Sequence, residues 1–508
     1  MNGLLKQQVL KLKKDLFINI GLSILSALLL ILSSAGFGFS YLVFVAFVPL
    51  LFAIKRGGLH PVFSGWITGF LYFLVCLSWM TVTFGYFGGA PMIASVGLLL
   101  FIALVGGFFF FVPFAYIARK YSNNPLLLAM VFIALEAAKG ALFFGGVPWL
   151  NLAQSQYQNI LILQFVSWFG ELGLSFIIMV INIFVFRIVT EPNKKRQVIA
   201  LSCAVIVMII PGIINKASQN QYEITKNVKI IQPGYKQEDK WTRDKVMNII
   251  QDMNKRIITT DKNHIDLIVM PESAYPARVL EVPFIMDILK KVTEKSPVIL
   301  GTDRRITDDS GTVTDLYNSM VLIDNNQEPQ IYNKRHLTPF GEYFPFENLL
   351  QPIKLFFFGP GAMFSAGDKA ALLRANDMKI APLICFESGF SELLKDSMAM
   401  GANMIVIISN DSWFGKNQGR IQHMAVNVMR AAEYGRATVV ATQDGISGFI
   451  MPSGEIKQMI TEQTPAELTC EIPITEKNTI YSSIRYIWIA FVIAIIYYFM
   501  RKNRTREE

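Results

Sequence analysis

The chain has 508 residues, of which 52% are hydrophobic and only 17% are charged, and its formal net charge is +9. Soluble globular proteins carry about 25% charged residues, so this composition excludes an ordinary soluble protein and indicates an integral membrane protein. The positive charge does not indicate a nucleic-acid partner. Many basic residues lie in short loops between apolar segments, and no basic groove motif with stacking aromatic residues is present.

The apolar residues are concentrated in two parts of the chain, from 16 to about 215 and from 484 to 500. A helix needs about 20 apolar residues to cross the hydrocarbon core of a bilayer. The segments predicted to do so are 16–35, 40–54, 62–82, 91–118, 125–144, 160–188, 197–215 and 482–500. The sequence therefore predicts a polytopic α-helical membrane domain of about eight spans in all. About seven lie in residues 1–215, and the last lies in a C-terminal segment, 481–508, that ends in a basic tail.

Basic residues predict the orientation of these spans. Clusters precede the first span and follow the second, fourth, sixth and last spans, at Lys6–Lys14, Lys55–Arg56, Arg119–Lys120, Arg187–Arg196 and Arg501–Arg506. The return loops near Gly36 and Gly88 carry no charge. By the positive-inside rule, both termini are cytoplasmic and residues 216–480 lie outside the cytoplasm. The basic start leads into an apolar run without a convincing cleavage site, so we expect an uncleaved anchor.

Residues 216–480 alternate between strand and helix patterns. The predicted strands are Val228–Gln232, Leu267–Glu272, Val298–Thr302, Ser319–Ile323, Ile380–Phe386, Met404–Asn410, Thr438–Thr442 and Gly448–Met451. The predicted helices are Arg243–Thr259, Val282–Thr293, Phe390–Gly401 and Gln418–Gly435. Apolar strands of this kind need helices on their outer faces. We therefore expect an extracytoplasmic α/β domain built as an α-β-β-α sandwich.

Three polar residues lie at or near the ends of predicted strands. Cys385 follows a buried strand and precedes a predicted helix, where helix N–H groups can lower the pKa of a thiol. Glu272 ends the strand Leu267–Glu272, and Lys334 follows Tyr332 and Asn333. This order of Glu, Lys and Cys is typical of nitrilase-type amide chemistry. A buried structural cysteine, a solvated glutamate and a surface lysine are the alternatives.

Six short stretches, taken in order, resemble the apolipoprotein N-acyltransferases, which are the membrane members of the nitrilase superfamily. The stretches are Gly146–Asn151, Gln232–Gly234 with Trp241, Pro271–Ser273, Tyr332–Tyr343, Ile384–Glu387 and Asn410–Gly415. The chain departs from the family at two positions. Phe386 replaces the usual Tyr, which removes a hydroxyl beside Cys385. Lys139 replaces an expected Arg, which keeps the positive charge but loses the pair of parallel hydrogen bonds that a guanidinium group can donate.

The resemblance implies transfer of a fatty acyl chain from a phospholipid to the N-terminal amine of a diacylglyceryl apolipoprotein in the bacterial inner membrane. Cys385 would form a thioester, and Glu272 would act as general base with a pKa raised by burial. Lys334 would stabilise the oxyanion and favour the thiolate. Neither a cofactor nor a metal site is expected, and we expect a monomer.

The remaining candidate site residues have two interpretations each. Glu342 and Glu387 could orient Lys334 or the incoming amine, or serve as structural hydrogen-bond acceptors. Four aromatic residues could line the acyl or headgroup pocket, or pack in the core: Trp241, Trp413, Tyr332 and Phe386. In the loop from Leu349 to Phe364, consecutive aromatic residues predict a lipid-gating tip, with packing on the domain surface as the alternative: Phe356, Phe357 and Phe358.

Three charged residues fall inside predicted spans: Glu136, Lys139 and Glu171. Charges at membrane depth are costly, so we expect them to face the protein interior and to support the loop that holds Trp149.

Two other functions would fit parts of the sequence. A membrane-anchored nitrilase-type hydrolase would use the same three residues, but eight spans are a costly anchor for a soluble substrate. A transporter or receptor would leave Glu272, Lys334 and Cys385 unexplained, and the sequence shows no clear internal repeat.

Overall fold

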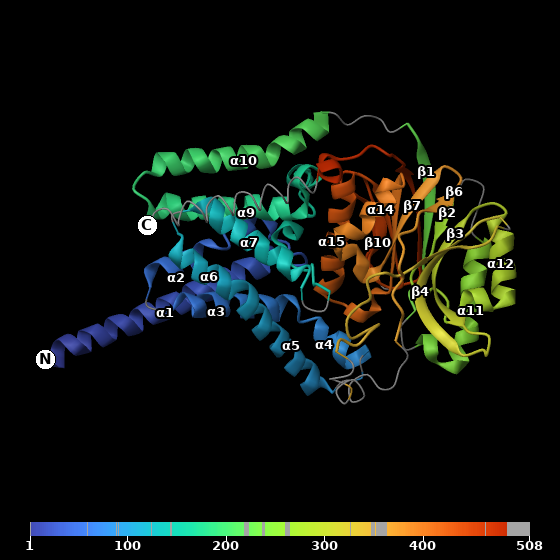
Figure 1. Ribbon diagram of the computed structural model, residues 1–508, viewed down its shortest axis with the longest axis horizontal. Coiled ribbons are helices and arrows are strands. Elements are labelled where there is room, and N and C mark those ends of the chain that lie inside the picture. The colour runs from blue at the N-terminus through green and yellow to red at the C-terminus, as the bar shows by residue number, and fades with distance from the viewer. Residues whose placement is uncertain are drawn as a thin grey trace. The chain divides into compact units, whose positions relative to one another are not determined.

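The computed structural model describes residues 2–484 except 58, 88, 90, 123, 143–144, 218–222, 236–238, 260–264, 326, 347–350, 352–362 and 463. The chain forms two compact units (Figure 1). The helical unit comprises Met1–Tyr86, Pro91–Ser218 and Thr479–Glu508. The α/β unit comprises Phe87–Ala90 and Gln219–Asn478.

The helical unit contains the helices α1 (Asn2–Ser33), α2 (Val48–Arg56), α3 (Pro61–Cys76), α4 (Met80–Val82), α5 (Met92–Gly106), α6 (Val112–Lys120), α7 (Pro125–Lys139), α8 (Ile160–Leu163), α9 (Val166–Thr190) and α10 (Lys194–Ala217). Within the described part of the chain, four helical stretches are long and apolar enough to cross a membrane. They are Lys13–Ser33, Met92–Lys120, Val166–Thr190 and Lys194–Lys216. These stretches confirm the first, fourth, sixth and seventh predicted spans as helices of membrane-crossing length and composition.

The second predicted span, 40–54, is wrong as a single helix. Ser40–Phe44 forms a 3-10 turn, and α2 begins separately at Val48 with a proline in its first turn. Proline favours the first turn of a helix because it lacks the N–H that would be unpaired there. The predicted span 125–144 is also shorter than expected, since α7 ends at Lys139. Residues 485–500 of the last predicted span lie outside the described residues.

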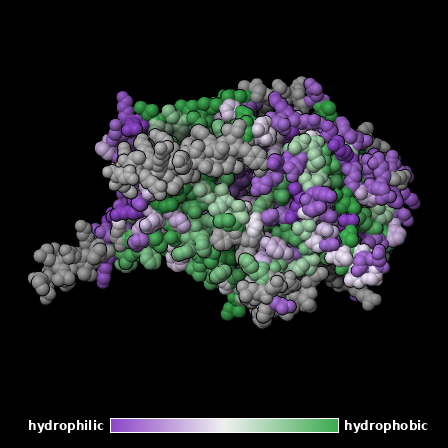
Figure 2. Space-filling model, viewed as in Figure 1, coloured by the Kyte–Doolittle hydropathy of each residue, from purple (hydrophilic) through white to green (hydrophobic). Residues whose placement is uncertain are grey.

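The outward side chains of the helical unit are largely hydrophobic. Ile93, Phe17 and Met92 are 85%, 72% and 69% exposed. Figure 2 shows hydrophobic side chains over much of the visible face of this unit, and hydrophilic ones over much of that of the α/β unit. Large exposed apolar areas indicate contact with another apolar phase, and for helices of this length that phase is a lipid bilayer.

Charged side chains inside the helical unit hold a loop. Lys139 Nζ donates to the carbonyl oxygen of Trp149 at 2.5 Å, and the N–H of Leu152 donates to Glu136 Oε1 at 2.8 Å. Glu171 on α9 accepts two side-chain amide bonds from the same loop, each at 2.8 Å. These contacts confirm that the three charged residues support the loop that carries Trp149.

The α/β unit contains two six-stranded sheets. Its strands are β1 (Thr225–Gln232), β2 (Leu267–Val269), β3 (Val298–Thr307), β4 (Val313–Ile323), β5 (Gln330–Asn333), β6 (Leu373–Ala375), β7 (Met378–Ile384), β8 (Met404–Ser409), β9 (Ala437–Thr442), β10 (Ser447–Ile450), β11 (Ile456–Ile460) and β12 (Ala466–Pro473). The strand orders are β12-β1-β2-β3-β4-β5 and β11-β10-β9-β8-β7-β6. In each sheet three neighbouring strands are parallel: β1, β2 and β3 in one, and β7, β8 and β9 in the other.

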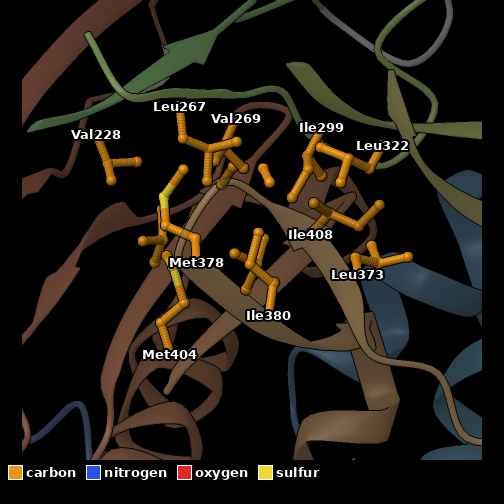
Figure 3. Packing of buried hydrophobic residues seen from close by; sticks show 14 of the residues in the cluster. Val228, Leu267, Val269, Ile299, Leu322, Leu373, Met378, Ile380, Met404 and Ile408 are labelled. Atoms are coloured by element: carbon orange, nitrogen blue, oxygen red, sulfur yellow. The ribbon is translucent and has the colours of Figure 1, made fainter. Parts of the chain in front are cut away.

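The two sheets pack face to face. Figure 3 shows apolar side chains of β1 to β4 meeting those of β6, β7 and β8, as between Ile299 and Ile408. A second apolar cluster joins the other face of the first sheet to α11 (Arg243–Thr259) and α12 (Pro283–Thr293). The second sheet is contacted by α14 (Lys395–Ala399) on β7 and by α15 (Gln418–Tyr434) on β9. This arrangement confirms the predicted sandwich of sheets and helices.

The predicted helix Phe390–Gly401 is confirmed only in part. Cys385–Gly389 and Ser391–Leu394 are separate 3-10 turns, and only Lys395–Ala399 is α-helical. Phe390, the first residue of the predicted helix, has an extended backbone, with φ −104° and ψ 94°, and therefore separates the two 3-10 turns. The predicted strand Leu267–Glu272 is shorter than expected, because β2 ends three residues before Glu272. The predicted strand Ile380–Phe386 is shifted by two residues, since β7 begins at Met378 and ends just before Cys385.

Candidate active site

The carboxyl ends of parallel strands from the two sheets meet at one place. Glu272 follows β2 in the first sheet, whereas Cys385 follows β7 and Asn410 follows β8 in the second. The N–H of Asn410 donates to Glu272 Oε2 at 2.8 Å, so the two sheets contact each other here. Residues at the ends of parallel strands are commonly functional, because the strands fix their positions while the side chains stay free to react.

Glu272 is held by a short strand, a strained turn and a close backbone contact. Its neighbour Ser273 has φ +49°, in the left-handed region that non-glycine residues rarely adopt. A Cβ on Gly301 of β3 would lie 2.6 Å from Glu272 Cα, so only glycine allows this approach. The Glu272 side chain accepts from Asn318 Nδ2 at 2.6 Å. Burial raises the pKa of Glu272, although Lys334 opposes the shift, which confirms the raised pKa predicted for this carboxyl group.

Lys334 is a buried cation in a network of carboxylates. It follows β5, its side chain is 1% exposed, and Nζ lies 2.7 Å from Glu342 Oε2. Asn318 Nδ2 donates to Glu342 Oε1 at 2.8 Å, so this amide bridges Glu342 and Glu272. Burial alone would lower the pKa of Lys334, but Glu342 and then Cys385 and Glu272 raise it above its ordinary value. Lys334 therefore stays positively charged, and it interacts electrostatically with both Cys385 and Glu272.

Cys385 begins a tight turn with a strained backbone. Its φ is +53°, a conformation that costs a non-glycine residue on the order of 1–3 kcal/mol. The lowered pKa predicted for its thiol is wrong. Burial and then Glu272 raise the pKa of Cys385, while Lys334 and the Ser409 hydroxyl oppose the shift without reversing it. The expected helix dipole is missing because Cys385 leads into a five-residue 3-10 turn, which aligns too few peptide groups.

Glu387 joins the turn of Cys385 to the segment of Lys334. It is fully buried and accepts from the N–H groups of Ile384, Arg335 and His336 at 2.9, 2.7 and 3.0 Å. The Tyr332 hydroxyl donates to both carboxylate oxygens, at 2.8 and 3.0 Å. These contacts are those of a structural acceptor, and they fix two neighbouring stretches of backbone against each other.

Comparison with known proteins gives the family of the chain. Residues 26–184 match the apolipoprotein N-acyltransferase N-terminal domain, and residues 227–476 match carbon-nitrogen hydrolase. The apolipoprotein N-acyltransferase of Shewanella oneidensis is 31% identical over 447 residues, which cover 83% of each chain. This chain belongs to the apolipoprotein N-acyltransferase family. The family member from Pasteurella multocida is 27% identical over 492 residues, or 93% of this chain and 92% of that one.

The chain is therefore a bacterial membrane enzyme that N-acylates lipoproteins, with a carbon-nitrogen hydrolase domain. Its resemblance to the family, stated above from short stretches, is confirmed. Among the residues that the structure describes, no group of three His, Cys, Asp or Glu side chains is placed to hold a metal ion.

The other predicted site residues are aromatic, and they differ in whether they are packed, exposed or outside the described part of the chain. Phe386 contacts the ring of Phe390, with 5.2 Å between centroids, and Trp413 is 37% exposed in the turn Asp411–Phe414. Trp241 lies in the 3-10 turn Asp239–Trp241, but its side chain is outside the described part. The predicted lipid-gating residues also lie outside the described residues: Phe356, Phe357 and Phe358.

Sequence reasoning missed several buried polar residues around the candidate site. Asn318 lies on β4, and Lys240 Nζ donates to the carbonyl oxygen of Ser273 at 2.6 Å. Burial lowers the pKa of Lys240 to about 8, against the opposing charge of Glu272. The missed residues beside Cys385 are Ser409, Asp411 and His423. The only signal for Lys240 was its position directly before Trp241.

Proposed function

We propose that the enzyme works in two half-reactions on Cys385, with Glu272 as general base and Lys334 as the fixed positive charge. The observation that carries this proposal is the position of Lys334, whose charge acts on both Cys385 and Glu272. A buried cation beside a nucleophile can stabilise the oxyanion of a tetrahedral intermediate. Glu342 and Asn318 support the proposal because they fix Lys334 and Glu272 in one network.

In the first half-reaction, Glu272 takes the thiol proton and Cys385 Sγ attacks an ester carbonyl of a phospholipid. The carbon–sulfur bond forms as the ester carbon–oxygen bond breaks, and the lysophospholipid alkoxide takes the proton from Glu272 as it leaves. A raised pKa suits Glu272 to this work, because a base with a pKa near the working pH both accepts and returns a proton readily.

In the second half-reaction, the N-terminal α-amine of an S-diacylglyceryl-cysteine apolipoprotein attacks the thioester carbonyl. Glu272 takes a proton from the nitrogen, the amide bond forms, and Cys385 leaves and regains its proton. A thioester keeps enough group-transfer potential to acylate an amine. The proposal therefore accounts for a cysteine, rather than a serine, at the end of β7.

We also propose that the chain crosses the membrane about eight times with both termini in the cytoplasm. The catalytic domain, residues 216–480, would then lie on the extracytoplasmic side. The five basic clusters at alternate ends of the predicted spans support this topology. Accessibility of single cysteines introduced at Lys55 and at Glu455 to a membrane-impermeant maleimide tests it. In intact cells only the cysteine at 455 should react.

Mass spectrometry distinguishes the acyltransferase mechanism from nitrilase-type hydrolysis. Incubation with phospholipid alone should add the mass of a fatty acyl chain to the peptide that contains Cys385. Subsequent addition of a diacylglyceryl lipopeptide should transfer that mass to its amine. Release of free fatty acid without acylation of the lipopeptide would instead support a hydrolase. The Cys385→Ala enzyme, which should carry no acyl chain and not restore lipoprotein N-acylation in a deficient strain, is the control.

A further inference from the structure

A chain of buried hydrogen bonds runs from Cys385 into the interior of the α/β unit. Ile384 and Ile408 pair in the parallel strands β7 and β8, so Cys385 and Ser409 are the next residues along the two neighbouring strands. The Ser409 hydroxyl lowers the pKa of the Cys385 thiol, which is the effect of a donor to the thiolate. The same hydroxyl donates to Asp411 Oδ1 at 2.6 Å. His423 Nδ1 on α15 lies 2.9 Å from that same oxygen. Ser409, Asp411 and His423 are each at most 2% exposed, so water does not compete for these bonds.

The imidazole ring of His423 is fixed at both nitrogens. Its Nε2 lies 3.1 Å from Ser388 Oγ and 3.3 Å from the carbonyl oxygen of Cys385. Burial alone would lower the pKa of His423, but Asp411 raises it; burial alone would raise the pKa of Asp411, but His423 lowers it. Both shifts have the sign expected for a buried imidazolium–carboxylate pair, in which Nδ1–H donates to Asp411.

The single hydrogen of Ser409 has two competing acceptors. One is Asp411 Oδ1, and the other is Sγ of Cys385 once that atom is ionised. A partly buried thiolate needs a donor, because a charge that is withdrawn from water and left unpaired is costly. Asp411 can release the hydroxyl, since His423 donates to the same oxygen and continues to satisfy it.

We propose that Ser409, Asp411 and His423 form a hydroxyl switch behind the nucleophile. Ser409 donates its hydrogen to Asp411 while Cys385 is a thiol or a thioester, and turns it to Sγ while Cys385 is a thiolate. The turn rotates the hydroxyl and breaks no covalent bond, and the thiol proton itself goes to Glu272. The inference rests on the proposed role of Cys385 as the nucleophile, and it makes the three residues positioning residues for that atom.

The charged groups that face the switch predict the direction of each substitution. Glu272, Lys334 and Asp411 act on Cys385. Arg420, like His423, acts on Asp411. Removal of the Asp411 charge should make thiolate formation easier for two reasons, since a nearby negative charge disappears and Ser409 is released. Removal of His423 should make it harder, because an unpaired Asp411 would hold the hydroxyl more strongly.

The test is the rate at which iodoacetamide alkylates Cys385 in the detergent-solubilised full-length enzyme, followed by mass spectrometry across a range of pH. Ser409→Ala should slow alkylation at neutral pH by about tenfold or more, as expected for one lost hydrogen bond to a charged group. His423→Phe should also slow it, and His423→Asn, which keeps a donor near Nδ1, should restore part of the rate. Asp411→Asn should accelerate it. A purely structural role would move all of these variants in one direction, which would overturn the proposal.

Ser447→Ala is the matched control for Ser409→Ala. Ser447 is also fully buried in the second sheet and donates to Gln232 at 2.6 Å, and its loss should leave the alkylation rate unchanged. Alkylation of Cys470 serves as the internal reference for loosening of the fold. In the Ser409→Ala background, the acceleration by Asp411→Asn should shrink; full additivity would contradict the switch.

These outcomes are separable from failure of the proposed function. If the Cys385→Ala enzyme still acylated a lipopeptide, the proposed function would fail, while the alkylation rates of the other variants would still report on the switch. If the acyl-enzyme formed but Ser409→Ala alkylated at the wild-type rate, only the switch would be lost.

Discussion

Replacement of Asn318 by alanine tests the bridge between the two carboxylates of the proposed site. Asn318 is 5% exposed, and its Nδ2 donates to Glu272 at 2.6 Å and to Glu342 at 2.8 Å. The substitution removes both bonds and leaves two buried oxygens without this donor. We expect it to act on the proton affinity of Glu272, because the lost bond favours the charged form of that carboxyl group.

The size of the effect follows from the cost of one hydrogen bond to a charged group, about 1.5–3 kcal/mol. Since one pKa unit corresponds to about 1.4 kcal/mol, the pKa of Glu272 should rise by roughly one to two units above its already raised value. At a pH below the original pKa, the fraction of Glu272 that can act as a base then falls about ten- to a hundredfold. Above the new pKa the rate should recover, because only the protonation state has changed.

The assay is a single-turnover measurement of acyl-enzyme formation from phospholipid, across the pH range in which the enzyme stays folded. Asn403→Ala is the matched control, because Asn403 is also 5% exposed and also makes two hydrogen bonds at 2.8 Å, to Lys379 N and Asp377 O. The control should lower the free energy of unfolding. It should not move the acid limb of the pH–rate profile, which is the low-pH range in which the rate rises as Glu272 loses its proton. An acid limb that stays in place for Asn318→Ala, or that moves equally for Asn403→Ala, would refute the reasoning.

Three further substitutions test the same site, by the same single-turnover assay and, for Gly301→Ala, also by thermal unfolding. Lys334→Met should slow acyl-enzyme formation by roughly a hundredfold or more at every pH, because it removes the charge that stabilises the oxyanion. Recovery of the rate at any pH would contradict that role. Lys240→Met should move the acid limb to higher pH, since loss of a nearby positive charge favours protonated Glu272; a shift to lower pH would contradict this. Gly301→Ala would place a Cβ 2.6 Å from Glu272 Cα, so thermal unfolding should show a loss of about 1–3 kcal/mol with a lower rate at all pH values. An unchanged melting temperature would show that the backbone of Glu272 can move.

The sequence predicted the strongly patterned elements of the α/β unit well. The helix α11 has the predicted bounds, Arg243–Thr259, because its apolar residues recur on one face over a length that only a helix explains. Four strands were not predicted. β5 and β6 have only four and three residues, and β11 exposes most of its side chains. β12 carries polar or charged residues at several positions, so its apolar pattern is weak.

The candidate site was predictable only where its residues follow buried strands. Glu272 and Cys385 could be found in this way, whereas Asn318 is 46 residues from Glu272 and meets it only through the order of strands in the first sheet. Asp411 and His423 likewise meet because a turn and α15 fold back behind β8. Such contacts depend on tertiary packing, which a local pattern does not contain.

The corrected pKa of Cys385 changes what the proposed base must do. A helix dipole would have given a resting thiolate, but the Cys385 thiol has a pKa above its ordinary value. The resting site is then a neutral thiol beside Glu272 and the permanently charged Lys334. Proton transfer to Glu272 must accompany attack on the ester, so the thiol becomes strongly nucleophilic only when a carbonyl is in place to accept the charge. A thiol of this kind resists stray electrophiles while no acyl donor is bound.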